Sequence, residues 1–127
     1  IESSGKFRAR DVEVGDAANA GGFLGFQKGT SALTISAGAI TVSSTYQDID
    51  TEGGADTDDL DTINGAAAGR ILILRPVNNQ RTVVVKDQTG NLYLNGDFTM
   101  DNIRDTIVLY GFNTGTWNEL SRSDNGA

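Results

Sequence analysis

The segment from Gly69 to Phe98 constrains the fold most, because three short apolar runs alternate there with two polar turns. The first run, "RILILRP" from Arg70 to Pro76, is nearly continuous and ends at a proline, which cannot donate to a sheet ladder. The second, "RTVVVKD" from Arg81 to Asp87, is rich in the β-branched residues that favour strands. In the "DQTGN" turn we expect positive φ at Gly90–Asn91, followed by the strand "NLYLNG". The segment therefore predicts three strands.

The same alternation continues on both sides of this segment. Residues 31–42 predict a hairpin that turns at "AGA", and Tyr46 lies in the next short strand. Residues 105–112 and 116–122 predict two strands joined by a turn at Asn113–Gly115. About seven to nine strands at regular spacing predict an all-β domain, a sandwich or barrel-like antiparallel meander. The exception is the stretch 56–65, whose acidic start and C-terminal Gly65 predict one short helical turn with Leu60 and Ile63 facing inward.

Residues 1–30 have a different character and predict an extended N-terminal arm ahead of a domain at 31–127. The arm contains the small, flexible stretch "GDAANAGG", which is followed by the apolar "FLGF". A segment this sparse in apolar residues cannot build its own core. We expect Phe23, Leu24 and Phe26 to make assembly contacts, either with the domain or with a neighbouring chain.

Composition limits the chemistry that the chain performs. It has no Cys and no His, which removes thiol nucleophiles, imidazole bases and the usual zinc ligands. The net charge of −7 argues against nucleic acid or an anionic membrane as partner, and no apolar run approaches the ~20 residues of a membrane-spanning helix. Any enzyme activity would have to rest on Asp, Glu, Lys, Ser or Tyr alone, and we expect no cofactor.

Acidic residues are concentrated between Lys28 and Arg70, where no basic residue occurs. Seven of the seventeen acids fall in this interval, at positions 48, 50, 52, 56, 58, 59 and 61. The spacing fails the EF-hand template, which needs Gly at the sixth and Glu at the twelfth loop position. We therefore predict solvated charges and no metal site. The basic residues Arg70, Arg75, Arg81 and Lys86 are interpreted as solvated strand ends or, alternatively, as partners of this acidic segment in an adjacent subunit.

Two further patterns suggest binding or catalysis. Tyr110, Phe112 and Trp117, with Tyr93, form a candidate glycan-binding platform, because amphipathic aromatic residues often lie in binding surfaces. The pattern favours a core position for Trp117, since it follows a turn in a strand. Asp97 and Asp101 are spaced as a carboxylate pair of a glycoside hydrolase, but turn edges explain them equally well.

Several motifs together resemble a known family. They are "DTEGGADTDDLDTING", the hairpin "TVVVKDQTGNLYLNGDFT" and the terminal "TWNELSRS". Across residues 32–127 the chain is similar to a C-terminal module of tailed-bacteriophage virion structural proteins, which include head-decoration, head-fibre and tail-fibre-like proteins. It departs from the family at Tyr110–Gly115, "YGFNTG", where a shorter "YDG" is expected.

The resemblance implies a non-enzymatic component of the virion that is β-rich and commonly a homotrimer. Its location would be the capsid surface or the tail, after synthesis in the host cytoplasm, and its partners other virion proteins. We expect a capsid decoration protein or fibre subunit that acts by assembly and binding. The alternative is a tail-fibre receptor-binding module that recognises a host surface glycan.

Overall fold

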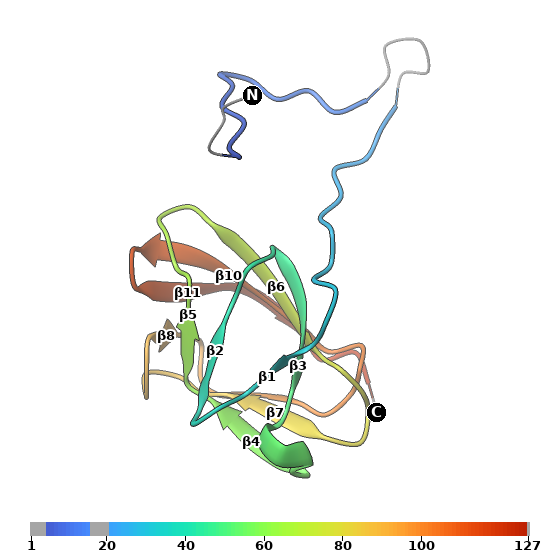
Figure 1. The fold of residues 1–127 in the computed structure, drawn as a ribbon, viewed down its shortest axis with the longest axis vertical. Coiled ribbons are helices and arrows are strands. Elements are labelled where there is room, and N and C mark those ends of the chain that lie inside the picture. The colour runs from blue at the N-terminus through green and yellow to red at the C-terminus, as the bar shows by residue number, and fades with distance from the viewer. Residues whose placement is uncertain (1–4, 16–20, 127) are drawn as a thin grey trace.

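The computed structural model describes residues 5–15 and 21–126, and almost all of their regular structure is β (Figure 1). Within these residues there are eleven strands and one short 3-10 helix, η1 (Glu52–Gly54). The predicted all-β class is confirmed, and the strand number exceeds the predicted seven to nine because several strands are only two or three residues long. The strands are β1 (Leu33–Thr34), β2 (Ala39–Thr41), β3 (Tyr46–Asp50), β4 (Thr57–Leu60), β5 (Thr62–Asn64), β6 (Ile71–Pro76), β7 (Thr82–Val85), β8 (Leu92–Tyr93), β9 (Phe98–Met100), β10 (Thr106–Asn113) and β11 (Thr116–Ser123).

The strands form three sheets, and the first half of the chain pairs in parallel. The sheets have the orders β1-β3-β6-β10-β11-β8, β2-β5 and β4-β7-β9. The pairs β1–β3, β3–β6, β2–β5, β4–β7 and β8–β11 are parallel, whereas β6–β10, β10–β11 and β7–β9 are antiparallel. The predicted antiparallel meander is therefore wrong for the first half. It is also wrong for β8, which pairs in parallel with β11 and forms no hairpin with β7.

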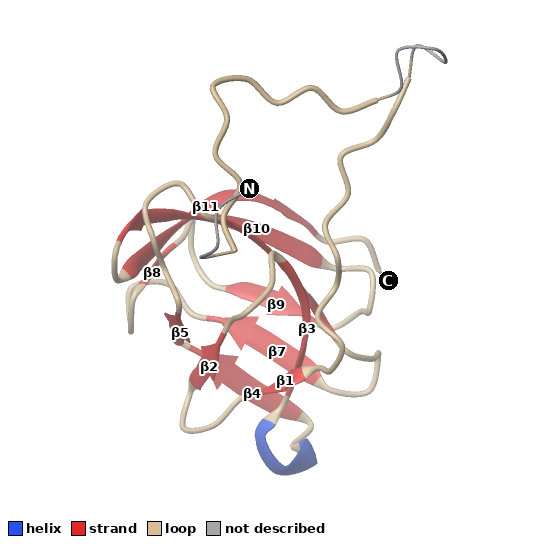
Figure 2. Ribbon diagram, turned by 45° about the horizontal axis from the view of Figure 1, so that its top comes forward, coloured by secondary structure: helices blue, strands red, loops and turns tan. Residues whose placement is uncertain are grey.

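The parallel pairing has a simple physical origin. Parallel strands need a crossover of a dozen or more residues, usually a helix. Here the crossover from β3 to β6 contains β4 and β5 instead, which in turn pair in parallel with β7 and β2. Successive turns of the chain thus stack on one another in a solenoid-like way, and the β10–β11 hairpin follows them (Figure 2).

The stretch that predicted a helical turn is instead two strands, β4 and β5. Leu60 and Ile63 do face inward, and both are fully buried. They reach the same core because the chain turns at Asp61, whose backbone N–H donates to the Gly38 carbonyl at 2.9 Å. The acidic residues that resemble a helix start therefore lie on and around a strand that pairs with β7.

The predictions about turns are confirmed at one position and wrong at another. Ala37 and Gly38 have φ of 49° and 79°, and Ser36 and Ala39 exchange two backbone hydrogen bonds of 3.0 Å around them, so the predicted turn is confirmed. The predicted hairpin is wrong, because beyond this bridge β1 pairs with β3 and β2 with β5, in different sheets. In the "DQTGN" turn, however, the residue with positive φ is Gln88, at 57°. Gly90 is needed for another reason, because a Cβ there would clash with the backbone oxygen of Asp61.

One hydrophobic cluster, drawn from all three sheets, forms the core. Its largest member is Trp117, which is 0% exposed, so the interpretation of this residue as a core residue is confirmed. Along β6 the burial alternates, with Leu72 and Leu74 buried and Ile71 and Ile73 half-buried. The nearly continuous apolar run of this strand therefore supplies both the core and the opposite face of the sheet.

Candidate assembly and binding surfaces

The N-terminal arm extends away from the β domain and exposes its large apolar side chains (Figures 1 and 2). Phe23 is 94% exposed, Leu24 71% and Phe26 43%. Nearer the N-terminus Phe7, Val12 and Val14 are also exposed. None of these side chains belongs to the core cluster or packs against it in the described part of the chain. Part of the predicted flexible stretch, residues 16–20, lies outside the described residues.

The arm joins the domain at Lys28. Lys28 forms an isolated parallel bridge with Tyr46, and the next backbone N–H, that of Gly29, donates to the Tyr46 carbonyl at 2.8 Å. The Lys28 ammonium lies 3.0 Å from Oδ2 of Asp48, whose Oδ1 accepts from Arg75 Nε at 2.7 Å. This double ion pair fixes the point where the arm leaves the edge of the main sheet.

The face of the main sheet directed away from the core is apolar across its centre. Tyr46 and Val108 are both in register with Ile73, and Tyr110 is in register with Ile71. All five side chains are half-buried. We call this set the outer face. The arm leaves the domain at the edge of the outer face, because Lys28 pairs with Tyr46.

The acidic segment is partly neutralised within the chain. Arg75 pairs with Asp48, and Arg81 forms a bidentate pair with Asp50 at 2.7 and 2.8 Å. The Arg81 hydrogen bonds lower the pKa of the Asp50 carboxyl below its ordinary value. Lys86 pairs with Asp97 at 2.6 Å, and Arg70 donates to the Gly65 carbonyl at 2.6 Å. Arg75, Arg81 and Lys86 therefore each have a carboxylate partner within their own chain, and pairing with an adjacent subunit stays a prediction.

The remaining carboxylates of the acidic segment have other surroundings. Within residues 5–15 and 21–126 no group of three or more acidic side chains has the geometry to hold a cation. Two of the segment's acids instead accept backbone hydrogen bonds: Glu52 from Ala37 N–H and Asp58 from Glu52 N–H, both at 2.7 Å. Asp97, of the candidate hydrolase pair, is bound to Lys86 and to the backbone N–H of Asp87, whereas Asp101 is exposed.

The candidate aromatic platform is only partly assembled, and Trp117 is excluded from it. Trp117 Nε1 donates to the Ile63 carbonyl at 3.0 Å inside the core, so this ring cannot stack on a ligand. Tyr110 is half-buried, and its hydroxyl accepts from Asn118 Nδ2 at 3.2 Å. Phe112 is 60% exposed and meets Tyr93, 49% exposed, in a hollow of about 290 Å³ that Asn113, Thr116 and Asn118 also line.

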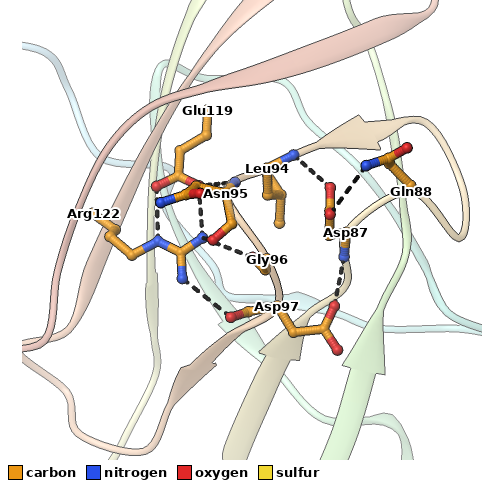
Figure 3. A network of polar contacts seen from close by, with 8 residues as sticks. All are labelled: Asp87, Gln88, Leu94, Asn95, Gly96, Asp97, Glu119 and Arg122. Atoms are coloured by element: carbon orange, nitrogen blue, oxygen red, sulfur yellow. Dashed lines mark hydrogen bonds and ion pairs between the residues drawn. The ribbon is translucent and has the colours of Figure 1, made fainter.

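A polar network around Arg122 brings together two motifs that are distant in the sequence (Figure 3). The Arg122 guanidinium binds Glu119 at 2.6 and 2.7 Å, and it lies 4.8 Å from the centre of the Phe98 ring. It also donates to the carbonyls of Asn95, Gly96 and Asp97. The "NGDF" turn and the terminal "ELSR" are thereby joined. Sequence reasoning missed this role, and the only signal for it was a Glu–Arg pair three residues apart.

This network predicts a loss of stability in acid. The hydrogen bonds from Arg122 lower the pKa of Glu119, and those from Arg81 lower the pKa of Asp50. A carboxyl whose folded pKa is depressed stabilises the fold above its unfolded pKa of about 4, and this contribution disappears as pH falls through the lower folded value. We expect the free energy of unfolding to decrease as the pH is lowered past about 4.5. Glu119→Gln should be less stable at neutral pH and show a shallower fall, measured by urea denaturation across pH. An equally steep fall in both proteins would contradict this assignment.

No protein-family model, no curated protein and no solved structure matches the chain. In the described residues, no helix is long and apolar enough to cross a membrane.

Proposed function

We propose that the chain is a non-enzymatic structural protein of a bacteriophage virion, located on the particle surface as a capsid decoration or fibre subunit. The resemblance of residues 32–127 to virion modules supplies the phage context. The observation that carries the assembly role is the arm, which exposes Phe23, Leu24 and Phe26 beside a domain that has its own complete core. Exposed apolar groups that are contiguous in this way mark interaction sites.

The energy available from one arm is modest. Burying a Phe or Leu side chain contributes roughly 1.5–3 kcal/mol, and fixing the backbone of each residue costs roughly 1–2 kcal/mol. Three anchors therefore only slightly exceed the entropy lost by residues 23–26. Attachment becomes firm when several arms act together, because linked binding events raise the effective concentration.

This energy balance supports a homo-oligomer, and we propose a trimer. The outer face, Tyr46, Ile71, Ile73, Val108 and Tyr110, offers apolar area at the edge where each arm departs. In a trimer the faces or arms of neighbouring copies cover one another, which removes apolar area from water. We regard the domain as barrel-like, since its three sheets surround one core.

The test replaces the three anchors of the arm. Phage particles are produced with the chain carrying Phe23→Ser, Leu24→Ser and Phe26→Ser, and its amount on gradient-purified particles is measured by immunoblot and by immunogold electron microscopy. We expect the variant to be lost from the particles while its near-UV circular dichroism stays unchanged, because these side chains lie outside the core.

The matched control is Leu120→Ser, which also removes an exposed apolar side chain, on β11 and outside the arm. This variant should attach normally. Normal attachment of the triple variant would overturn the role of the arm, and absence of the wild-type chain from every particle would overturn the virion assignment. Gold label over heads or over tails distinguishes a decoration protein from a tail fibre.

A further inference from the structure

The hollow at the end of the β10–β11 hairpin combines aromatic, amide and hydroxyl side chains. It is lined by Tyr93, Phe112, Asn113, Thr116 and Asn118. None of these is charged, in a chain whose net charge is −7. An uncharged lining provides nothing to neutralise a phosphate, a sulfate or a cation. It therefore favours a neutral ligand that combines apolar surface with hydroxyl groups.

Strand register places the aromatic and amide side chains side by side. Asn118 on β11 is in register with Tyr110 on one side and with Tyr93 on the other. Phe112 lies at the register shift between Gly111 and Asn113, and it lines the hollow together with Tyr93 and Asn118. The two exposed rings thus flank an amide, and Trp117 of the same strand points to the opposite side, into the core.

Existing hydrogen bonds fix the amides so that their remaining groups stay available. Oδ1 of Asn113 accepts from the Thr116 backbone N–H at 3.0 Å and from its hydroxyl at 2.8 Å, which leaves Nδ2 of Asn113 to donate. Nδ2 of Asn118 donates to the Tyr110 hydroxyl, which leaves Oδ1 of Asn118 to accept. A held donor and a held acceptor therefore line the same hollow, and pre-organised groups lose little entropy on binding.

These features match the chemistry of a sugar ring, which has an apolar C–H face and hydroxyls around its rim. Aromatic rings supply stacking area and polar tips, and ligand sites are mostly apolar with a few placed polar groups. The volume of about 290 Å³ lies at the lower edge of the ~300–1,000 Å³ typical of ligand pockets. Single-stranded nucleic acid also stacks on aromatics, but it needs a basic groove, and no basic residue lines this one.

We propose that this hollow binds a neutral carbohydrate, a terminal hexose or N-acetylhexosamine, through Tyr93, Phe112, Asn113 and Asn118. The site goes beyond the assembly role and does not depend on it. It also revises the set of candidate residues. Trp117 and Tyr110 leave the site, and Asn113 and Asn118 enter it.

The experiment presents the full chain to an array that carries neutral oligosaccharides beside sialylated and sulfated ones. We expect binding to neutral glycans alone. Phe112→Ala and Tyr93→Ala should each weaken it at least tenfold, and Tyr93→Phe should keep most of it because stacking is retained. Leu120→Ala is the matched control, since Leu120 is equally exposed on β11 but does not line the hollow.

Three results would overturn the site: no binding to any neutral glycan, binding confined to the acidic glycans, or wild-type binding by Phe112→Ala. Sedimentation of the same variants separates a glycan site from a contact between copies. A Phe112→Ala chain that changes its oligomeric state would assign the hollow to self-association and would also overturn the proposal. An unchanged oligomeric state together with lost glycan binding supports it.

Discussion

Replacing Trp117 by alanine should lower the free energy of unfolding by about 3–5 kcal/mol, the range for a large aromatic residue removed from a core. Trp117 has no exposed surface. Its indole N–H donates to the Ile63 carbonyl, so it links β11 to β5 in a different sheet. The carbonyl keeps a second donor, Nδ2 of Asn91 at 2.8 Å. The loss therefore comes mainly from the cavity and the lost burial, with little from an unpaired acceptor.

Urea denaturation followed by far-UV circular dichroism measures this loss without using the indole as the probe. Tyr93→Ala is the matched control, because it removes an exposed aromatic side chain from the adjacent strand. Its effect should stay within about 0.5 kcal/mol, as for most surface substitutions. A loss below about 1 kcal/mol for Trp117→Ala would contradict the core position, since a buried Trp→Ala change costs several times more. Because we expect the substitution to disturb the fold, it is unsuitable as a test of glycan binding.

Replacing Asp105 by alanine should lower the free energy of unfolding by about 2–4 kcal/mol, because three backbone donors lose a charged acceptor. Asp105 is fully buried. Its Oδ2 accepts from the N–H groups of Asp101 at 3.0 Å and Asn102 at 2.9 Å, and its Oδ1 from that of Asn125 at 2.8 Å. One carboxylate thus holds the loop before β10 to the segment that follows β11.

Asp101→Ala is the control for this prediction, because it removes an exposed carboxylate and leaves the Asp101 N–H donating to Asp105. It should be nearly neutral. The stability of Asp105→Asn should lie between those of Asp105→Ala and Asp101→Ala. An amide keeps one accepting oxygen but turns an N–H₂ group toward a backbone donor. Amide hydrogen exchange should accelerate at Asp101, Asn102 and Asn125 in Asp105→Ala. Unchanged exchange at all three would contradict the role given to Asp105.

Local patterns in the sequence predicted the structure correctly where it depends on a single strand or turn. The runs at 70–76, 81–87, 105–112 and 116–122 all contain strands, and the Ala37–Gly38 turn was found from its residues. The helical turn predicted for 56–65 is wrong because acids and a C-terminal glycine favour a helix start and end, whereas only the threonines favour a strand. The pairing of this stretch with β7 and β2, which lie elsewhere in the chain, decided in favour of strands.

Of the two binding surfaces, the sequence indicates one, and only the fold assembles the other. The exposure of Phe23, Leu24 and Phe26 could be anticipated, because so sparse a segment has no core of its own. The membership of the hollow could not. The aromatic residues near the hairpin alternate between the two faces of the sheet, and the face that is buried depends on register with β6 and β8.

By itself, the sequence determined the all-β class, most strand positions, a separate apolar arm and the absence of thiol and imidazole chemistry, because composition and short-range periodicity carry this information. Only the tertiary structure decided which strands pair in parallel, which cations neutralise Asp48 and Asp50, and that Trp117 is buried while Tyr93 and Phe112 share a hollow. These features depend on contacts between residues far apart in the chain. A single sequence specifies such contacts only through the free energy of the whole fold, in which no local pattern identifies the partner.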